Sequence, residues 1–170
     1  AIDSGWAIYK FNGTPTGVLA DDYTLIASQQ GTSGGEVLFR EYYVDVDDGL
    51  DTNNGSKATP FKTITYALSI VYGLTKTPLC RIHVNEGYYE ESFTITDDVD
   101  IVGVKSFREA GAVYIDGTIT IQAFCTIKNL SAATLIHSWT GQSNVIDCSF
   151  DNPITAIRGE IRGCKFYSAV

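Results

Sequence analysis

Four aspartates crowd one short segment of this sequence and are the side chains best suited to hold a metal ion. Asp45, Asp47, Asp48 and Asp51 lie within seven residues, beside several Asn and Gly residues. Oxygen-rich loops of this kind bind Ca²⁺, although no Glu stands twelve positions on from Asp45, where an EF-hand would need one. The alternative is a solvated turn whose carboxylates accept bonds from nearby backbone N–H groups. Ca²⁺ is the only cofactor that the sequence suggests.

A second group of carboxylates follows a predicted strand. Glu86, Glu90 and Glu91 stand beside Tyr88 and Tyr89. Two carboxylates about 5–10 Å apart can serve as acid and base in glycoside hydrolysis. The alternative is that these glutamates bond to the backbone at a corner of the fold.

Aromatic and basic residues of the second half are candidates for carbohydrate binding. Trp139 and Tyr114 carry flat, amphipathic rings that can stack on sugars. Arg158 and Arg162 are spaced so that they can lie near each other on one outer face. These four residues are the candidate carbohydrate ligands, although the aromatic rings could equally pack one subunit against another.

The two histidines lack the neighbours that a catalytic role would need. His83 points opposite to Ile82 and Val84 in a predicted strand, and His137 lies close to Trp139. We expect both histidines to be exposed or half-buried polar residues of strands. There is no G-x-S-x-G motif and no P-loop, so the sequence identifies no catalytic residue.

The cysteines show neither a C-x-x-C motif nor a zinc-ligand spacing. They are Cys80, Cys125, Cys148 and Cys164. We expect buried free thiols, because Cys behaves as a small hydrophobe in protein cores. A disulfide between neighbouring turns of the fold is the alternative.

Composition excludes two classes of partner. The net charge is −8, from 12 Lys and Arg against 20 Asp and Glu, whereas nucleic-acid binding needs a cationic surface. No segment approaches the run of about 18 apolar residues that spans a membrane. Apolar residues make up 44% of the chain, enough for a core. We therefore expect no nucleic-acid partner and no membrane association.

The elements that would position these side chains begin with a strand and a turn. Val44 and Val46 alternate with aspartates, which is the period of a half-buried strand. Asp48–Ser56 is rich in Asp, Asn and Gly, which favour turns. Arg81–Val84 is the next predicted strand.

A helix is predicted over about residues 60–72. Pro60 suits the first helical position, where its missing N–H costs nothing, and Thr59 before it is a plausible N-cap. Gly73 is a stop signal. Apolar residues at helical spacing are Ile64, Ala67, Leu68 and Val71.

An internal repeat predicts a solenoid. Residues 92–104 align with residues 118–130 at a constant offset of 26, and Lys105–Ala112 would form an outward loop. Residues 127–132 align in turn with 145–150 and 161–166. The alignment places a bend at Asn129, Asp147 and Gly163, and it matches Val104 with Leu130. Equivalent residues should stack about 4.8 Å apart, as columns, between neighbouring parallel strands. The expected columns are Leu130 with Cys148 and Cys164, Ile127 with Val145 and Ile161, and Ile95 with Ile121.

The sequence divides into two parts. Residues 1–41 have the pattern of a small β appendage or connector, with strands near residues 6–11 and 23–26 and a hairpin signal at Asn12-Gly13. Residues 42–170 have the pattern of the N-terminal part of a parallel β-helix. We expect the whole to be a fragment of a longer protein.

Residues 44–90 resemble the opening segment of pectin-lyase-like right-handed parallel β-helix proteins. The matching residues are Val44-Asp45, Gly49, Asp51, Asn53, Gly55-Ser56, Pro60-Phe61, Thr63-Ile64, Ala67-Leu68, Ile82, Val84, Gly87, Tyr89 and Glu90. The resemblance implies an all-β right-handed parallel β-helix whose N-terminal helix caps the open end. This fold hosts lyases, esterases, hydrolases, adhesins and phage tail proteins, so it does not decide the function.

The first 41 residues also resemble short β segments of phage tail proteins. Together these features lead us to expect a virion component: a tail fibre or tailspike segment that contacts cell-surface polysaccharide. Such a chain would be a homotrimer, bound to other virion structural proteins and located in the virion tail or outside the cell. The alternatives are a secreted pectin-lyase-like lyase or hydrolase and a bacterial surface adhesin.

Overall fold

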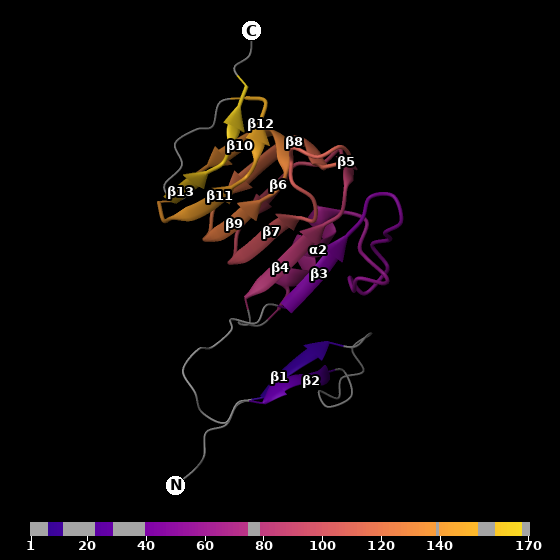
Figure 1. Ribbon diagram of the computed structural model, residues 1–170. Helices are drawn as coiled ribbons and strands as arrows, with labels where there is room; N and C mark the ends of the chain where they lie inside the picture. Colours follow the sequence, from indigo (N-terminus) through magenta and orange to yellow (C-terminus); the bar gives the residue numbers. More distant parts are fainter. Residues whose placement is uncertain are drawn as a thin grey trace.

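The computed structural model of the chain describes residues 7–11, 23–28, 40–74, 79–138, 140–152 and 159–167. These residues form a mostly β structure with two six-stranded sheets and one α-helix (Figure 1). The predicted mostly β architecture with parallel strands is therefore confirmed. In addition, β1 (Ala7–Phe11) and β2 (Tyr23–Ser28) lie where two strands were predicted, and they pair antiparallel. The Asn12-Gly13 signal lies outside the described residues.

Both six-stranded sheets contain only parallel pairs. The first sheet has the order β13-β11-β9-β7-β4-β3, and the second has the order β14-β12-β10-β8-β5, with β6 also paired to β8. The strands of the first sheet are β3 (Arg40–Val44), β4 (Cys80–Val84), β7 (Val99–Gly103), β9 (Cys125–Lys128), β11 (Ser143–Ile146) and β13 (Gly159–Arg162). Those of the second are β5 (Gly87–Tyr89), β6 (Phe93–Ile95), β8 (Val113–Ile121), β10 (Ser131–His137), β12 (Ser149–Phe150) and β14 (Lys165–Phe166). From β7 onward the chain alternates between the two sheets, so each pass adds one strand to both.

The core consists of columns of apolar side chains, because residues in register on neighbouring parallel strands point the same way. Ile101, Ile127, Val145 and Ile161 follow one another in register, and Ile95 pairs with Ile121. In the second sheet, Ser131 pairs with Ser149, and Ser149 pairs with Lys165. The residues directly before these three are Leu130, Cys148 and Cys164, which therefore also lie next to one another on successive strands. The predicted columns are therefore confirmed.

The predicted bends are also present. Asn129 and Asp147 have positive φ angles of 58° and 51°, and Gly163 has a φ of 69°. Each lies between a strand of the first sheet and a strand of the second. Asn and Asp tolerate this left-handed conformation better than other non-glycine residues. Gly103 is the equivalent residue in the preceding repeat. A Cβ added to Gly103 would lie 2.0 Å from the Asn129 carbonyl oxygen, so a larger residue would clash there.

The loop that follows β7 departs from the repeat. Val104 was matched with buried Leu130, but its side chain is 48% exposed. The chain turns away one residue earlier than the alignment implies, and residues 104–112 run as bends and turns before β8, where the outward loop was expected.

Helix α2 (Ile64–Tyr72) begins four residues later than predicted. Pro60 and Phe61 are not helical; Phe61 bridges to Val44 at the edge of β3 instead. Thr63, rather than Thr59, is the N-cap, and its side chain accepts a bond from the Tyr66 N–H.

The buried face of α2 is the predicted one, and Gly73 ends the helix as predicted. Its buried residues are Ile64, Ala67, Leu68 and Val71. They join one hydrophobic core with the residues of both sheets.

The predicted strand at Val44–Asp47 is wrong beyond Val44. β3 ends there, and a turn follows over Val46–Asp48 because the Asp45 side chain accepts the N–H groups of Asp47 and Asp48, each at 3.0 Å. Local side-chain bonding of this kind competes with strand pairing.

All four cysteines are free, as expected. Cys80, Cys125 and Cys148 are buried, and Cys164 is half-buried. Burial raises the pKa of Cys80, and it raises the pKa of Cys125 to about 12. These two thiols therefore act as small apolar groups of the core.

Candidate functional site

Two tyrosines on the outer side of the second sheet form the most developed aromatic surface among the described residues. Tyr88 of β5 and Tyr114 of β8 are partners in register. Their neighbours Tyr89 and Ile115 are buried, so the alternation of a strand turns Tyr88 and Tyr114 outward. The two rings stack with centroids 5.4 Å apart and planes 14° from parallel.

Each tyrosine hydroxyl donates a short hydrogen bond to a carboxylate. Tyr88 bonds to Asp116 Oδ2, and Tyr114 bonds to Asp151 Oδ2. These bonds raise the pKa of both phenols to about 12, because a carboxylate acceptor favours the protonated donor. We call Tyr88, Tyr114, Asp116 and Asp151 the tyrosine row.

The tyrosine row combines the two features that saccharide sites use. Its rings offer apolar surface on which the C–H groups of a sugar can pack. Its carboxylates are held by the phenols through one oxygen, which leaves the other oxygen of each able to accept a hydroxyl proton. Tyr88 is 53% exposed, so a ligand can reach the row.

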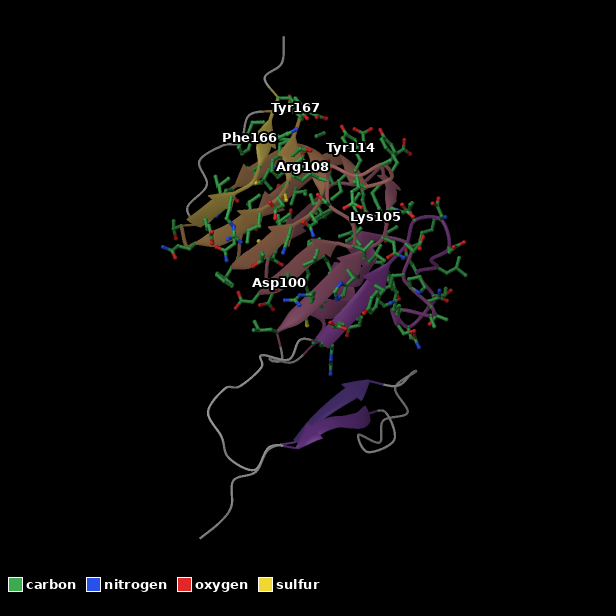
Figure 2. The ribbon with its side chains drawn as sticks, viewed as in Figure 1. Asp100, Lys105, Arg108, Tyr114, Phe166 and Tyr167 are labelled. Atoms are coloured by element: carbon green, nitrogen blue, oxygen red, sulfur yellow. The ribbon has the colours of Figure 1, made fainter. Side chains whose placement is uncertain are left out.

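A basic loop follows β7 near this surface. Lys105 pairs with Glu86, and the Arg108 guanidinium lies 5.1 Å from the centre of the Phe107 ring. Arg108 also donates to the Gly163 carbonyl oxygen at 3.5 Å. Figure 2 shows Lys105, Arg108 and Tyr114 in the same part of the molecule.

Of the other residues proposed as carbohydrate ligands, Arg162 is described, and it does not join Tyr114. Arg162 lies in β13, in the first sheet, and pairs with Glu160 at 3.6 Å. Tyr114 belongs to the second sheet, so the two residues stand on different sheets. Trp139 and Arg158 lie outside the described residues.

The acidic turn uses its carboxylates as hydrogen-bond acceptors. Asp45 accepts the two turn N–H groups and the Asn85 side-chain amide at 2.7 Å, and hydrogen bonds of this kind lower its pKa although burial acts against them. Asp51 accepts the N–H groups of Lys62 and Thr63 at 2.9 and 3.0 Å. Within the described ranges, no group of three or more His, Cys, Asp or Glu residues is arranged to hold a metal ion. Ca²⁺ binding by Asp45, Asp47, Asp48 and Asp51 stays a prediction.

Among the described residues, the three glutamates proposed as acid and base share no partner. Glu86 pairs with Lys105, and Glu90 is exposed. Glu91 accepts the N–H groups of Ile64 and Thr65, both at 2.9 Å. A carboxylate at this place satisfies free donors of the α2 N-terminus and complements the helix dipole. Glu91 therefore has the backbone-bonding role that was the alternative.

The outer side of the first sheet carries an arrangement that sequence reasoning missed. Glu41 lies 3.3 Å from His83 Nε2 and accepts the Tyr43 hydroxyl at 3.2 Å, and the Tyr43 ring stacks on His83. Beside this group, Arg81 pairs with Asp100 at 3.1 Å. The alternation of apolar and polar residues in the sequence indicated that His83 faces outward. The sequence did not indicate that β3 lies next to β4, so the contact with Glu41 was not predicted.

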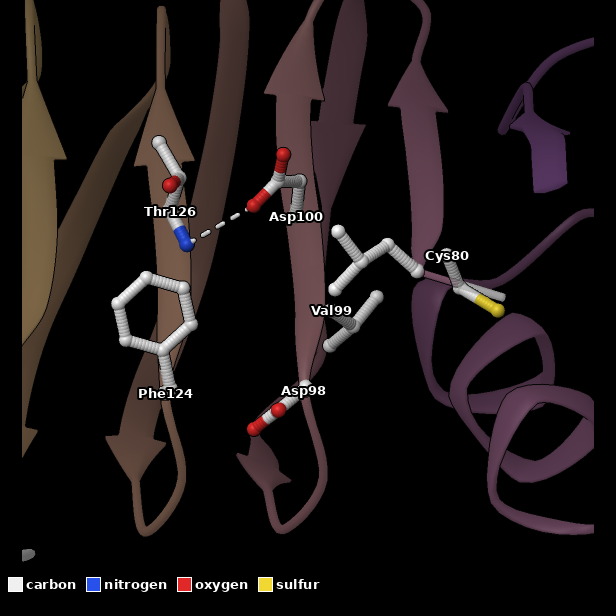
Figure 3. A pocket seen from close by; sticks show the side chains of 7 residues that line it. Cys80, Asp98, Val99, Asp100, Phe124 and Thr126 are labelled. Atoms are coloured by element: carbon white, nitrogen blue, oxygen red, sulfur yellow. Dashed lines mark hydrogen bonds between the residues drawn. The ribbon is translucent and has the colours of Figure 1, made fainter. Parts of the chain in front are cut away.

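A shallow depression of about 150 Å³ lies on the same outer side, at the start of β4, β7 and β9 (Figure 3). Leu79 and Phe124 are its exposed apolar walls, with 39% and 41% of their surfaces accessible. Its lining residues are Leu79, Cys80, Asp98, Val99, Asp100, Phe124 and Thr126. We call it the Phe124 slot.

His137 differs from the expectation for it. Its side chain is only 7% exposed and follows Ile121 in register, facing the core. Neither ring nitrogen has a hydrogen-bond partner among the described residues. A shift in register between Ala132 and Thr134 places Leu135 and His137 on the inner side of β10.

The fold and surfaces define a β-rich protein built on two parallel sheets with aromatic and acidic groups on its outer sides. Residues 47–138 match the model of a family described as a protein of unknown function, DUF1565. The match covers more than half of the 170 residues, and the chain belongs to this family. The family is associated with β-helix-like proteins.

No curated protein and no solved structure matches the chain. In the described part of the chain, no helix has the length and apolar character needed to cross a membrane.

Proposed function

We propose that this chain is a right-handed parallel β-helix that binds polysaccharide on its outer surface and does not cleave it. Support for the fold comes from strands that alternate between two parallel sheets, from the columns in register and from the family match. Helix α2, whose apolar face packs into the same core, is the proposed cap of one end.

The tyrosine row is the observation that carries the binding function. It offers stacked rings and two oriented carboxylates on an exposed sheet, which is the chemistry that recognises a neutral chain of sugars. Aromatic platforms with hydrogen-bond acceptors bind without needing a catalytic pair.

The proposed biological setting is a phage tail fibre or tailspike segment, assembled as a homotrimer, that contacts cell-surface polysaccharide. A binding role without cleavage agrees with the structural use of Glu86 and Glu91. In this setting the chain would bind other virion structural proteins and would work outside the cell.

The test is binding of the purified chain to a panel of bacterial surface polysaccharides, measured together with release of reducing ends. We expect binding without release. Substituting both Tyr88→Ala and Tyr114→Ala should weaken binding about tenfold, since an aromatic contact contributes about 0.5–1.5 kcal/mol beyond its buried area. Tyr167→Ala is the matched control, because Tyr167 is equally exposed but lies outside the row.

Two results would overturn the proposal. One is unchanged binding by the double variant, and the other is release of reducing ends or unsaturated sugars. Light scattering tests the setting separately: three chains per particle are expected, and a monomer at all concentrations would contradict the trimer.

A further inference from the structure

The Phe124 slot has room for a single six-membered ring. Leu79, Asp98 and Phe124 each directly precede a strand, and those strands are in register through Cys80, Val99 and Cys125. The two apolar walls therefore stand two strands apart, about 9.6 Å between backbones at about 4.8 Å per strand. Asp98 lies between them.

The two carboxylates of the slot differ in their partners. Asp100 uses one oxygen on Arg81 at 3.1 Å and the other on the Thr126 N–H at 3.2 Å, the bond drawn in Figure 3. The Asp98 carboxylate is exposed, and no described residue forms an ion pair or hydrogen bond with it. Within the described ranges, the slot thus holds one carboxylate paired with a cation and one without a counter-charge.

The different pairing of Asp98 and Asp100 determines which ligand charge the slot favours. Arg81, a cation beside the slot, is paired with Asp100, and the chain as a whole carries a net charge of −8. An anionic sugar such as a uronate would meet the Asp98 carboxylate and be repelled. An ammonium group would meet the Asp98 carboxylate and the Phe124 ring, both of which attract cations.

We infer that the Phe124 slot binds an amino sugar. Its C–H face would pack on the Phe124 ring between the two apolar walls, with its ammonium group on Asp98. The Thr126 hydroxyl, at the opposite end of the slot, is placed to bond a sugar hydroxyl. The site lies on the first sheet and shares only the ligand class, saccharide, with the proposed function of the tyrosine row.

The test compares two probes that differ at the sugar nitrogen, which carries an ammonium group in one and a neutral acetamide in the other: a β-1,4-linked glucosamine tetramer and its N-acetylated counterpart. Each is titrated into ¹⁵N-labelled protein while backbone amide shifts are followed by NMR. We expect the amides of Val99 and Phe124 to shift, and the glucosamine tetramer to bind about two- to fivefold more tightly, the range of an exposed ion pair. Salt should remove the difference, because the pair is exposed.

Two variants separate the charge from the aromatic contact. Asp98→Asn should abolish the preference for the amine and leave binding of the acetylated tetramer unchanged. Phe124→Ala should weaken both probes by about three- to tenfold. Both residues are exposed or partly exposed, so neither change removes core packing.

Equal affinity for both tetramers, or shifts confined to other residues, would overturn the inference. The variant with Ala at both Tyr88 and Tyr114 tells the two sites apart. It should leave the shifts at Val99 intact, whatever its effect on polysaccharide binding.

Discussion

Ile127 and Ile161 occupy the same column of the core, yet their environments are opposite. Ile127 is fully buried between β7 and β11, whereas Ile161, on the edge strand β13, is 45% exposed. Phe150 and Phe166 repeat the contrast in the second sheet, with 0% and 46% of their surfaces exposed. At the other end of the stack, α2 packs its apolar face against the core. In this architecture a side chain is buried when strands lie on both sides of its own strand. Two residues of the same type can therefore differ completely in burial.

The largest effect should come from the interior of the column. Ile127→Ala should lower the free energy of unfolding by about 2–5 kcal/mol, through lost burial and the cavity that remains. Ile161→Ala, the same change on the edge strand β13, should cost less than about 1 kcal/mol, because much of its surface is already in water. Urea denaturation of both variants measures the difference. Equal losses would refute the contrast between interior and edge.

An interior position can also be improved. His137→Leu should raise the free energy of unfolding by about 1–3 kcal/mol, because it removes buried nitrogens that no described residue satisfies. The matched change His83→Leu should bring no such gain, since His83 Nε2 already faces Glu41. Thermal and urea unfolding of the two variants check this prediction. A loss of stability in His137→Leu would show that the imidazole has a partner of its own.

The helical end depends on one carboxylate. Glu91→Ala should destabilise the protein by about 1–2 kcal/mol, because the N–H groups of Ile64 and Thr65 lose their acceptor. Its neighbour Glu90 is exposed, and Glu90→Ala should change little. Hydrogen exchange of the α2 amides, measured with the unfolding curves, locates the effect. If both variants unfold alike, the α2 end is held by packing alone.

The smallest effect concerns reactivity. Cys148 and Cys164 are neighbours in one column, and the adjacent Cys148 thiol lowers the pKa of Cys164 below the usual thiol value. Thiolate is the reactive form, so Cys164 should be alkylated first and at lower pH than an ordinary cysteine. Mass spectrometry after brief treatment with iodoacetamide identifies the modified site. In Cys148→Ala, Cys164 should react more slowly at neutral pH; an unchanged rate would contradict the effect of Cys148.

Local sequence patterns correctly predicted those parts of the fold that depend on residue spacing along the chain. The columns through Ile95, Ile127 and Leu130 followed from the repeat, because a fixed offset places equivalent residues in register. The apolar face of α2 followed from its spacing. The helix start did not, because Pro60 and Thr59 form a valid local signal that pairing of Phe61 with Val44 overrides.

Contacts between distant residues were beyond the reach of the sequence. Glu91 caps a helix that begins 27 positions earlier, and Tyr114 reaches Asp151 across 37 positions. Likewise, the Glu41–His83 contact depends on β3 lying next to β4. Tyr114 was a candidate by residue type alone, whereas its carboxylate partner and Tyr88 stacking emerged only with the register.

The loop over residues 104–112 has a consequence for how such chains change length. Successive turns of the repeat differ in residue count, yet Ile101 and Ile127 stay in register because the additional residues leave the stack between β7 and β8. A peptide tag or small domain inserted near Glu109 should therefore be accepted without disturbing folding. The same tolerance would let related chains diversify their surfaces here by insertion, while the columns beneath remain constant.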